Sequence, residues 1–176
     1  EARLDGSEVH LDVPVCALLS IGLIGDEEKV PQLTQWLESG KIGRAKLSDL
    51  EKSWVVAALG KIGHPDALKP LSKVLREKGR YAKRSAAIAI GQIAKQTDQD
   101  DQLKFCKMLA QFHKNEGDLT SKNYAIISLG RIGGDANASE KVRDAVKSFL
   151  KKAYKESNKT TERPFAALAM GLVGFD

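Results

Sequence analysis

A nine-residue phrase recurs five times in this chain and constrains its fold more than any other feature. The copies are ALLSIGLIG at 17–25, VVAALGKIG at 55–63, AAIAIGQIA at 86–94, AIISLGRIG at 125–133 and AALAMGLVG at 166–174. Their first glycines, Gly22, Gly60, Gly91, Gly130 and Gly171, are 38, 31, 39 and 41 residues apart. Periods of this length are typical of helix-turn-helix units, which stack on their neighbours to bury their apolar faces. The sequence therefore predicts an all-α repeat protein.

Each repeat is expected to contain two helices. The phrase spaces its apolar residues as one helix, and its closing glycine falls where a left-handed cap ends a helix. Asp26 after Gly25, and Pro65 with Asp66 after Gly63, are start signals for a second helix. The apolar stripes predicted for the second helices are Val30, Leu33, Trp36 and Leu37; Leu68, Leu71, Val74 and Leu75; Leu103, Cys106, Leu109 and Ala110; and Val142, Ala145 and Phe149. Links rich in small and polar residues, near 40–48, 115–121 and 156–162, are expected to be turns.

The repeated pattern resembles the HEAT-repeat family, and most of all the short bacterial form also found in bilin-lyase-like proteins. The pattern is a basic residue, small residues and Ala, then Leu-Gly-x-Ile-Gly-Asp and a second helix. The resemblance implies a right-handed α-solenoid of about four and a half HEAT-type repeats. It also implies one domain over residues 1–176, as part of a longer bacterial protein. The basic position holds Lys52, Lys83, Lys122 and Arg163, whereas the first repeat has Pro14 there. Since this residue recurs with the repeat, we expect it to bind carboxylates or carbonyls of the adjoining repeat.

Positive charge is concentrated in the middle of the chain, whose net charge is +5. Residues 1–40 carry 2 basic and 8 acidic side chains, residues 41–95 carry 13 and 4, and residues 96–176 carry 13 and 11. When the second helices are aligned on their first apolar residue, basic residues recur one, five or eight positions later. We call these residues the basic strip: Lys69, Lys73, Arg76, Lys104, Arg143 and Lys147. The resemblance implies that second helices line the concave face of the solenoid, so the basic strip is the predicted partner-binding site.

Three functions are compatible with the basic strip. We expect a non-enzymatic scaffold that binds an acidic or extended protein partner, because like charges on one wall raise the local concentration of anions. The first alternative is a nucleic-acid-binding module, although no aromatic side chains lie among the lysines to stack bases. The second alternative, from the bilin-lyase-like type of repeat, is a chromophore-handling protein. A fourth interpretation gives the strip no partner, since charged residues also solvate exposed helix faces.

The sequence offers no catalytic or cofactor motif. His10, His64 and His113 lie in three different contexts and none precedes Glu, and there is no Gly-x-Ser-x-Gly or Walker-type motif. A turn role is expected for His64. The two cysteines, Cys16 and Cys106, lie 90 residues apart and predict no disulfide, and Cys106 is expected to be a small buried hydrophobe. No stretch approaches the roughly 18 apolar residues of a membrane-spanning helix. We therefore expect neither an enzyme nor a cofactor, and the compartment stays open.

Overall fold

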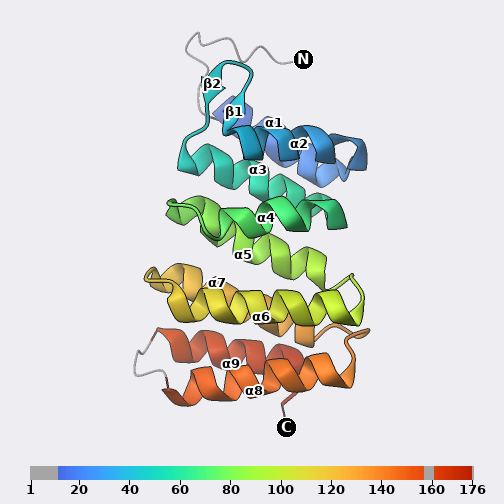
Figure 1. Ribbon diagram of the computed structural model, residues 1–176, viewed down its shortest axis with the longest axis vertical. Coiled ribbons are helices and arrows are strands. Elements are labelled where there is room, and N and C mark those ends of the chain that lie inside the picture. The colour runs from blue at the N-terminus through green and yellow to red at the C-terminus, as the bar shows by residue number, and fades with distance from the viewer. Residues whose placement is uncertain (1–11, 157–160, 176) are drawn as a thin grey trace. The chain divides into compact units, whose positions relative to one another are not determined.

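The computed structural model describes residues 12–156 and 161–175, whose regular structure is helical apart from one short hairpin (Figure 1). The five phrases lie in five first helices, as predicted: α1 (Asp12–Ile24), α3 (Asp49–Ile62), α5 (Arg80–Ala94), α7 (Leu119–Gly133) and α9 (Glu162–Val173). Second helices follow in between: η1 (Glu27–Lys29) with α2 (Val30–Ser39), η2 (Pro65–Ala67) with α4 (Leu68–Val74), α6 (Gln99–Asn115) and α8 (Glu140–Glu156). The predicted all-α repeat class is confirmed, while the handedness and the number of repeats stay predictions.

The chain divides into two compact units. The N-terminal unit comprises residues 1–89 and the C-terminal unit residues 90–176, with the division inside α5. Within the N-terminal unit α1 packs on α3, and α2 packs on both α3 and α4. Within the C-terminal unit α7 packs on α9, and the second helices α6 and α8 lie side by side (Figure 1). The expectation of a single domain stays a prediction.

First helices of successive repeats meet at a glycine and a small residue. A methyl group on Gly22 would lie 2.9 Å from the Cα atom of Ala58, and one on Gly130 would lie 2.8 Å from the Cβ atom of Ala169. Both alanines are completely buried. Gly171 differs, because among the described residues nothing lies within 4 Å of a methyl group placed there. The repeated glycine therefore allows two helix backbones to approach closely wherever a further helix covers it.

Of the four phrases that close on glycine, three end in the predicted left-handed cap and one does not. Gly25, Gly63 and Gly174 have φ values of 72°, 83° and 72°. The helix α7 instead runs through Gly133, and Gly134 after it has φ −89°. A methyl group on Gly133 would lie 2.9 Å from the Cβ atom of Val146 on α8. The left-handed cap predicted at Gly133 is therefore wrong, since this glycine allows close packing of α8.

The same contact explains an error in the core predicted for α8. The buried residues of this helix are Val142, Val146 and Leu150, whereas Ala145 is exposed. The sequence pattern at intervals of three and seven residues favoured Ala145 and Phe149, but Val146 occupies the close approach to Gly133. The stripe predicted for α4 is confirmed in full, because all four of its residues are buried.

The start signals predicted for the second helices of the first two repeats are confirmed, and both of these helices follow a 3-10 turn. The side chain of Asp26 accepts a hydrogen bond of 3.0 Å from the backbone N–H of Glu28. The Nδ1 atom of His64 accepts one of 3.3 Å from the N–H of Asp66, so His64 has the expected turn role. These caps satisfy backbone donors that have no partner inside the helix.

One link between repeats is a hairpin and not the turn expected from its composition. Strand β1 (Lys41–Ile42) pairs antiparallel with β2 (Ala45–Lys46). The GKIG motif at 40–43 supplies its two left-handed glycines, Gly40 at φ 66° and Gly43 at φ 58°.

Among the described helices, none is long and apolar enough to cross a membrane.

Candidate partner-binding site

Three residues of the basic strip lie in the N-terminal unit. Lys69 and Lys73 are exposed on α4, but this helix ends at Val74, so Arg76 lies in the turn that follows. The backbone N–H of Arg76 donates to the carbonyl of Lys73 at 2.9 Å. The prediction that all three residues share one helix face is therefore wrong for Arg76.

The turn after α4 is fixed by contacts that the sequence pattern does not contain. The Nζ atom of Lys52 on α3 binds the carboxylate of Glu77 at 2.7 Å. Four and five residues after Glu77, the N–H groups of Tyr81 and Ala82 donate hydrogen bonds to the carboxylate of Asp49, at 2.9 and 3.2 Å, so that Asp49 caps α5. These contacts bind the chain back to α3 and end α4 early.

Lys73 forms an ion pair with Glu38 on α2. Its ammonium group donates a hydrogen bond to the carboxylate, and this bond, with the charges of Lys73 and Lys69, lowers the pKa of Glu38. The pair borders a space of about 300 Å³, the α2–α4 hollow, lined by Leu37, Glu38, Pro70, Lys73, Val74 and Glu77. The positive charge of Lys73 is thus offset by carboxylates in this hollow.

The other three residues of the basic strip lie in the C-terminal unit and contact neighbours of their own. Lys104 is 3.0 Å from the carboxylate of Asp101, one turn earlier on α6. The guanidinium of Arg143 donates to the carbonyls of Asp135 and Ala136 at 3.2 and 3.1 Å. The ammonium of Lys147 lies 5.4 Å from the ring centre of Phe175. Arg143 and Lys147 therefore have structural contacts that the predicted binding role did not foresee.

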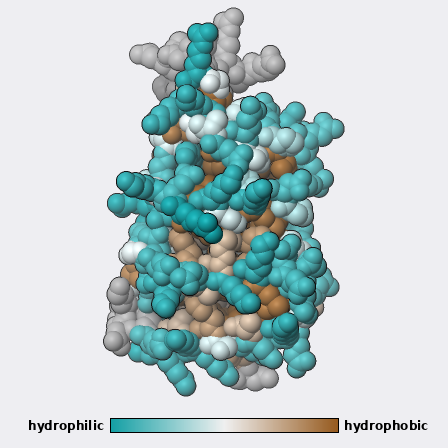
Figure 2. Space-filling view, viewed as in Figure 1, coloured by the Kyte–Doolittle hydropathy of each residue, from teal (hydrophilic) through white to brown (hydrophobic). Residues whose placement is uncertain are grey.

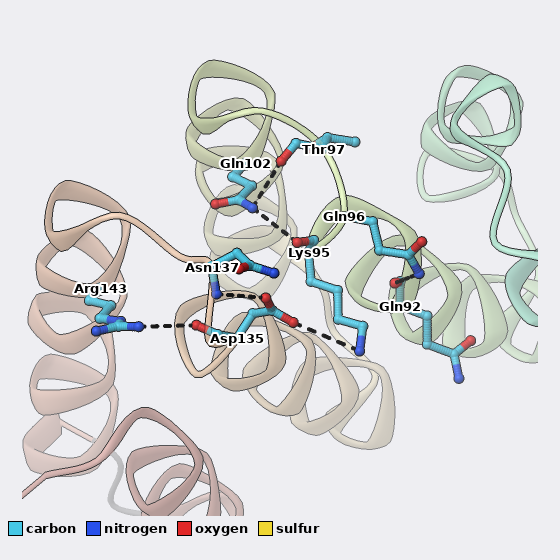
Figure 3. A network of polar contacts seen from close by, with 8 residues as sticks. All are labelled: Gln92, Lys95, Gln96, Thr97, Gln102, Asp135, Asn137 and Arg143. Carbon is cyan, nitrogen blue, oxygen red and sulfur yellow. Dashed lines mark hydrogen bonds and ion pairs between the residues drawn. The ribbon is translucent and has the colours of Figure 1, made fainter.

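Arg143 belongs to a polar network at two turns of the C-terminal unit, one between α5 and α6 and one between α7 and α8 (Figure 3). The carboxylate of Asp135 accepts from the N–H of Asn137 at 3.0 Å and lies 3.9 Å from the ammonium of Lys95. The buried side chain of Gln102 donates to the carbonyls of Lys95 and Thr97, both at 3.0 Å. Turns α5–α6 and α7–α8 are thereby joined through Lys95.

The basic column of the first helices forms ion pairs as expected at two positions. Lys52 binds Glu77 at 2.7 Å, and Lys122 on α7 lies 4.0 Å from the carboxylate of Glu162 on α9. Both lysines are largely buried, with 23% and 20% of their side chains exposed. The predicted contact with the adjoining repeat is confirmed for Lys122, because Glu162 lies on the next repeat, whereas Lys52 binds a carboxylate of its own repeat.

A second space, the α6–α8 groove, is larger and was missed from the sequence. It has a volume of about 520 Å³ and is lined by Lys107, Ala110, Gln111, His113, Lys114, Phe149, Lys152, Ala153 and Glu156. Figure 2 shows apolar side chains gathered between hydrophilic ones on this face of the C-terminal unit. The sequence contained a signal for this groove, because its lining residues recur at the spacing of one helix face. On α6 these are residues 107, 111 and 114, and on α8 they are residues 149, 153 and 156.

The α6–α8 groove combines an aromatic wall with a cationic rim. The rings of His113 and Phe149 meet edge to face, with centres 5.3 Å apart. Burial, together with the charge of Lys122, lowers the pKa of His113, while Glu162 acts in the opposite direction. His113 is therefore uncharged at neutral pH. The rim carries three exposed lysines, Lys107, Lys114 and Lys152, against the single carboxylate of Glu156.

The two cysteines differ in their surroundings, since Cys16 is exposed and Cys106 is buried. Cys106 is 5% exposed, and burial raises the pKa of its thiol to about 12. The prediction of a small buried hydrophobe is confirmed, and both cysteines are free. Within residues 12–156 and 161–175, no three His, Cys, Asp or Glu side chains gather where they could hold a metal ion.

Comparison with known proteins identifies the repeat. No curated protein matches the chain. Residues 52–77 match the family model described as PBS lyase HEAT-like repeat. The match extends from the first turn of α3 to the turn after α4, which is one helix pair of the predicted repeat. Residues 52–77 are therefore a HEAT-like repeat, of the kind that the resemblance of the five phrases indicated.

Proposed function

We propose that this protein is a non-enzymatic scaffold that binds an acidic segment of another protein on its second helices. The observation that carries the proposal is the rim of the α6–α8 groove, where Lys107, Lys114 and Lys152 stand against Glu156 alone. Clustered lysines on one wall attract a carboxylate-rich segment. The proposal moves the centre of binding in the C-terminal unit from Arg143 and Lys147 to these three residues.

The chemistry of the polar side chains supports a non-enzymatic role. His64 accepts a backbone hydrogen bond at a helix start, and His113 is half-buried and uncharged. The Cys106 thiol stays protonated at neutral pH because burial raises its pKa. A thiol held in this form is a poor nucleophile.

The alternative partner is nucleic acid, because the positive charge of the rim lysines attracts phosphates as well as carboxylates. The two partners differ in the contacts they need. Single strands gain much of their affinity by stacking bases on exposed aromatic rings, whereas the two rings that line the groove, those of His113 and Phe149, are half-buried. Chromophore handling stays an alternative that only the type of repeat suggests.

The test is fluorescence anisotropy with a labelled oligoglutamate and a labelled single-stranded oligothymidine, at roughly 20 mM and 200 mM salt. We expect oligoglutamate to bind at low salt and to bind more weakly at high salt. The double variant Lys107→Glu/Lys114→Glu should abolish this binding. The matched control, Lys41→Glu/Lys46→Glu, makes the same change of charge on the exposed ends of the hairpin and should leave binding intact. Absence of binding at low salt would overturn the proposal, and tighter binding of oligothymidine would favour nucleic acid.

A further inference from the structure

The α6–α8 groove has features that select one kind of side chain in an acidic partner. We propose that the groove binds an acidic peptide by taking up one aromatic side chain between α6 and α8, while flanking carboxylates meet the rim lysines. This inference rests on the proposed function and adds to it the residue that anchors the partner.

The groove has space for a large side chain of a partner. Ala110 on α6 and Ala153 on α8 have short side chains that line the groove, and both are only partly exposed. The groove measures about 520 Å³, against about 300 Å³ for the α2–α4 hollow. In the hollow an ion pair between Lys73 and Glu38 joins the two second helices. In the groove, the apolar surface between the helices lies beside hydrophilic rims (Figure 2).

The wall of the groove is aromatic and suits an aromatic side chain of a partner. Phe149 is half-buried, and the imidazole of His113 already meets it edge to face at 5.3 Å. Aromatic rings pack favourably against such a pair in offset or edge-to-face geometry. An aromatic ligand also accepts cation–π contacts from the rim, whereas an aliphatic side chain gains only burial.

The rim of the groove is positively charged. Lys107 and Lys114 are exposed on α6, and Lys152 on α8 has 70% of its side chain exposed. Lys152 lies 3.9 Å from Glu156, one turn later on the same helix. Exposed pairs of this kind are weak in water, so Lys152 can exchange this partner for a carboxylate of a ligand. Charge complementarity therefore favours acidic residues on both sides of the aromatic anchor.

The test uses two labelled heptapeptides of glutamate, one with tryptophan and one with alanine at the centre. In fluorescence anisotropy at low salt, the tryptophan peptide should bind about tenfold more tightly, because its ring is buried in the groove. The variant Ala153→Phe fills the groove and should remove this preference without weakening the alanine peptide. Its matched control, Ala145→Phe, places the same ring at an exposed position of α8 outside the groove and should keep the preference.

Each outcome decides a separate point. Equal binding of the two peptides would overturn the aromatic anchor and leave the proposed function standing. A preference that survives in Ala153→Phe would also overturn it, because the ring would then bind elsewhere. If neither peptide binds, the proposed function fails together with the inference. Circular dichroism checks that the variants fold, and Ala110→Phe, which blocks the groove from α6, replaces Ala153→Phe if that variant does not fold.

Discussion

The α2–α4 hollow and the α6–α8 groove both lie between consecutive second helices, one in each compact unit, yet their linings differ. The hollow of about 300 Å³ contains Lys73 together with two carboxylates, those of Glu38 and Glu77. The groove of about 520 Å³ contains three lysines, one carboxylate and the ring of Phe149. In the hollow the lysine is bound across the gap by Glu38, whereas the closest ion pair in the groove joins residues of one helix.

This difference separates the residues that the repeats share from those that vary between them. The first helices use the same glycine and small residue in both units, at Gly22 with Ala58 and at Gly130 with Ala169. That contact fixes the packing and leaves no freedom for function. The second helices vary the residues at the edge of the gap, where Ala110, Ala153 and Phe149 line the groove and an ion pair between Lys73 and Glu38 borders the hollow.

The largest predicted effect tests whether the two units share their packing. Gly22→Ala and Gly130→Ala should each lower the free energy of unfolding by about 1–3 kcal/mol. A methyl group at either position would lie within 2.9 Å of an atom of the facing helix, and the nearest atoms include backbone that cannot rotate away. Urea denaturation followed by circular dichroism measures the loss.

The control for this prediction is Gly171→Ala, at the same register of α9. Among the described residues nothing lies within 4 Å of the added methyl group, and alanine favours a helix over glycine. The variant should be unchanged or more stable by roughly 0.5–1 kcal/mol. Equal losses in Gly130→Ala and Gly171→Ala would mean that helix packing is not the reason for the repeated glycine.

The helices and their starts could be predicted from the sequence because their signals are local. The phrase repeats its apolar residues at helical spacing, and capping residues such as Asp26 and His64 act on backbone only two residues away. The helix pair matched by the family model lies where the phrase predicted it. Local periodicity and caps are sufficient for this level of structure.

The candidate site could be predicted only in part, because its geometry depends on contacts between distant residues. Arg76 does not lie on the predicted helix face, because α4 ends at Val74. The turn that follows is bound to α3 by the ion pair between Lys52 and Glu77. The register of α8 followed the approach of Val146 to Gly133, which no single-helix pattern contains. The lysines of the groove were visible as a helix face, but the space beside them depends on how α6 packs against α8.

A smaller effect distinguishes the wall of the groove from the hollow, which has no histidine among its lining residues. Burial lowers the pKa of His113 in the folded protein, so the unfolded chain takes up a proton more readily. Stability should therefore be greatest above the ordinary histidine pKa of about 6.5 and should fall as the pH decreases towards the lowered value. Urea denaturation at pH 7.5 and at acidic pH measures the change. His113→Gln should reduce this dependence, and an unchanged slope would mean that other groups cause it.

The smallest effect concerns the ion pair in the hollow. The hydrogen bond and charge of Lys73 lower the pKa of Glu38, and the charge of Lys69 contributes less. In a carboxyl titration followed by NMR, Lys73→Gln should return the Glu38 pKa towards its ordinary value, and Lys69→Gln should move it less. Neither variant should change the melting temperature measurably, because both side chains of the pair are exposed. If Lys73→Gln leaves the Glu38 pKa where it was, the hollow does not hold its lysine in solution. In that case charge pairing would not separate the hollow from the groove, and only the aromatic wall would.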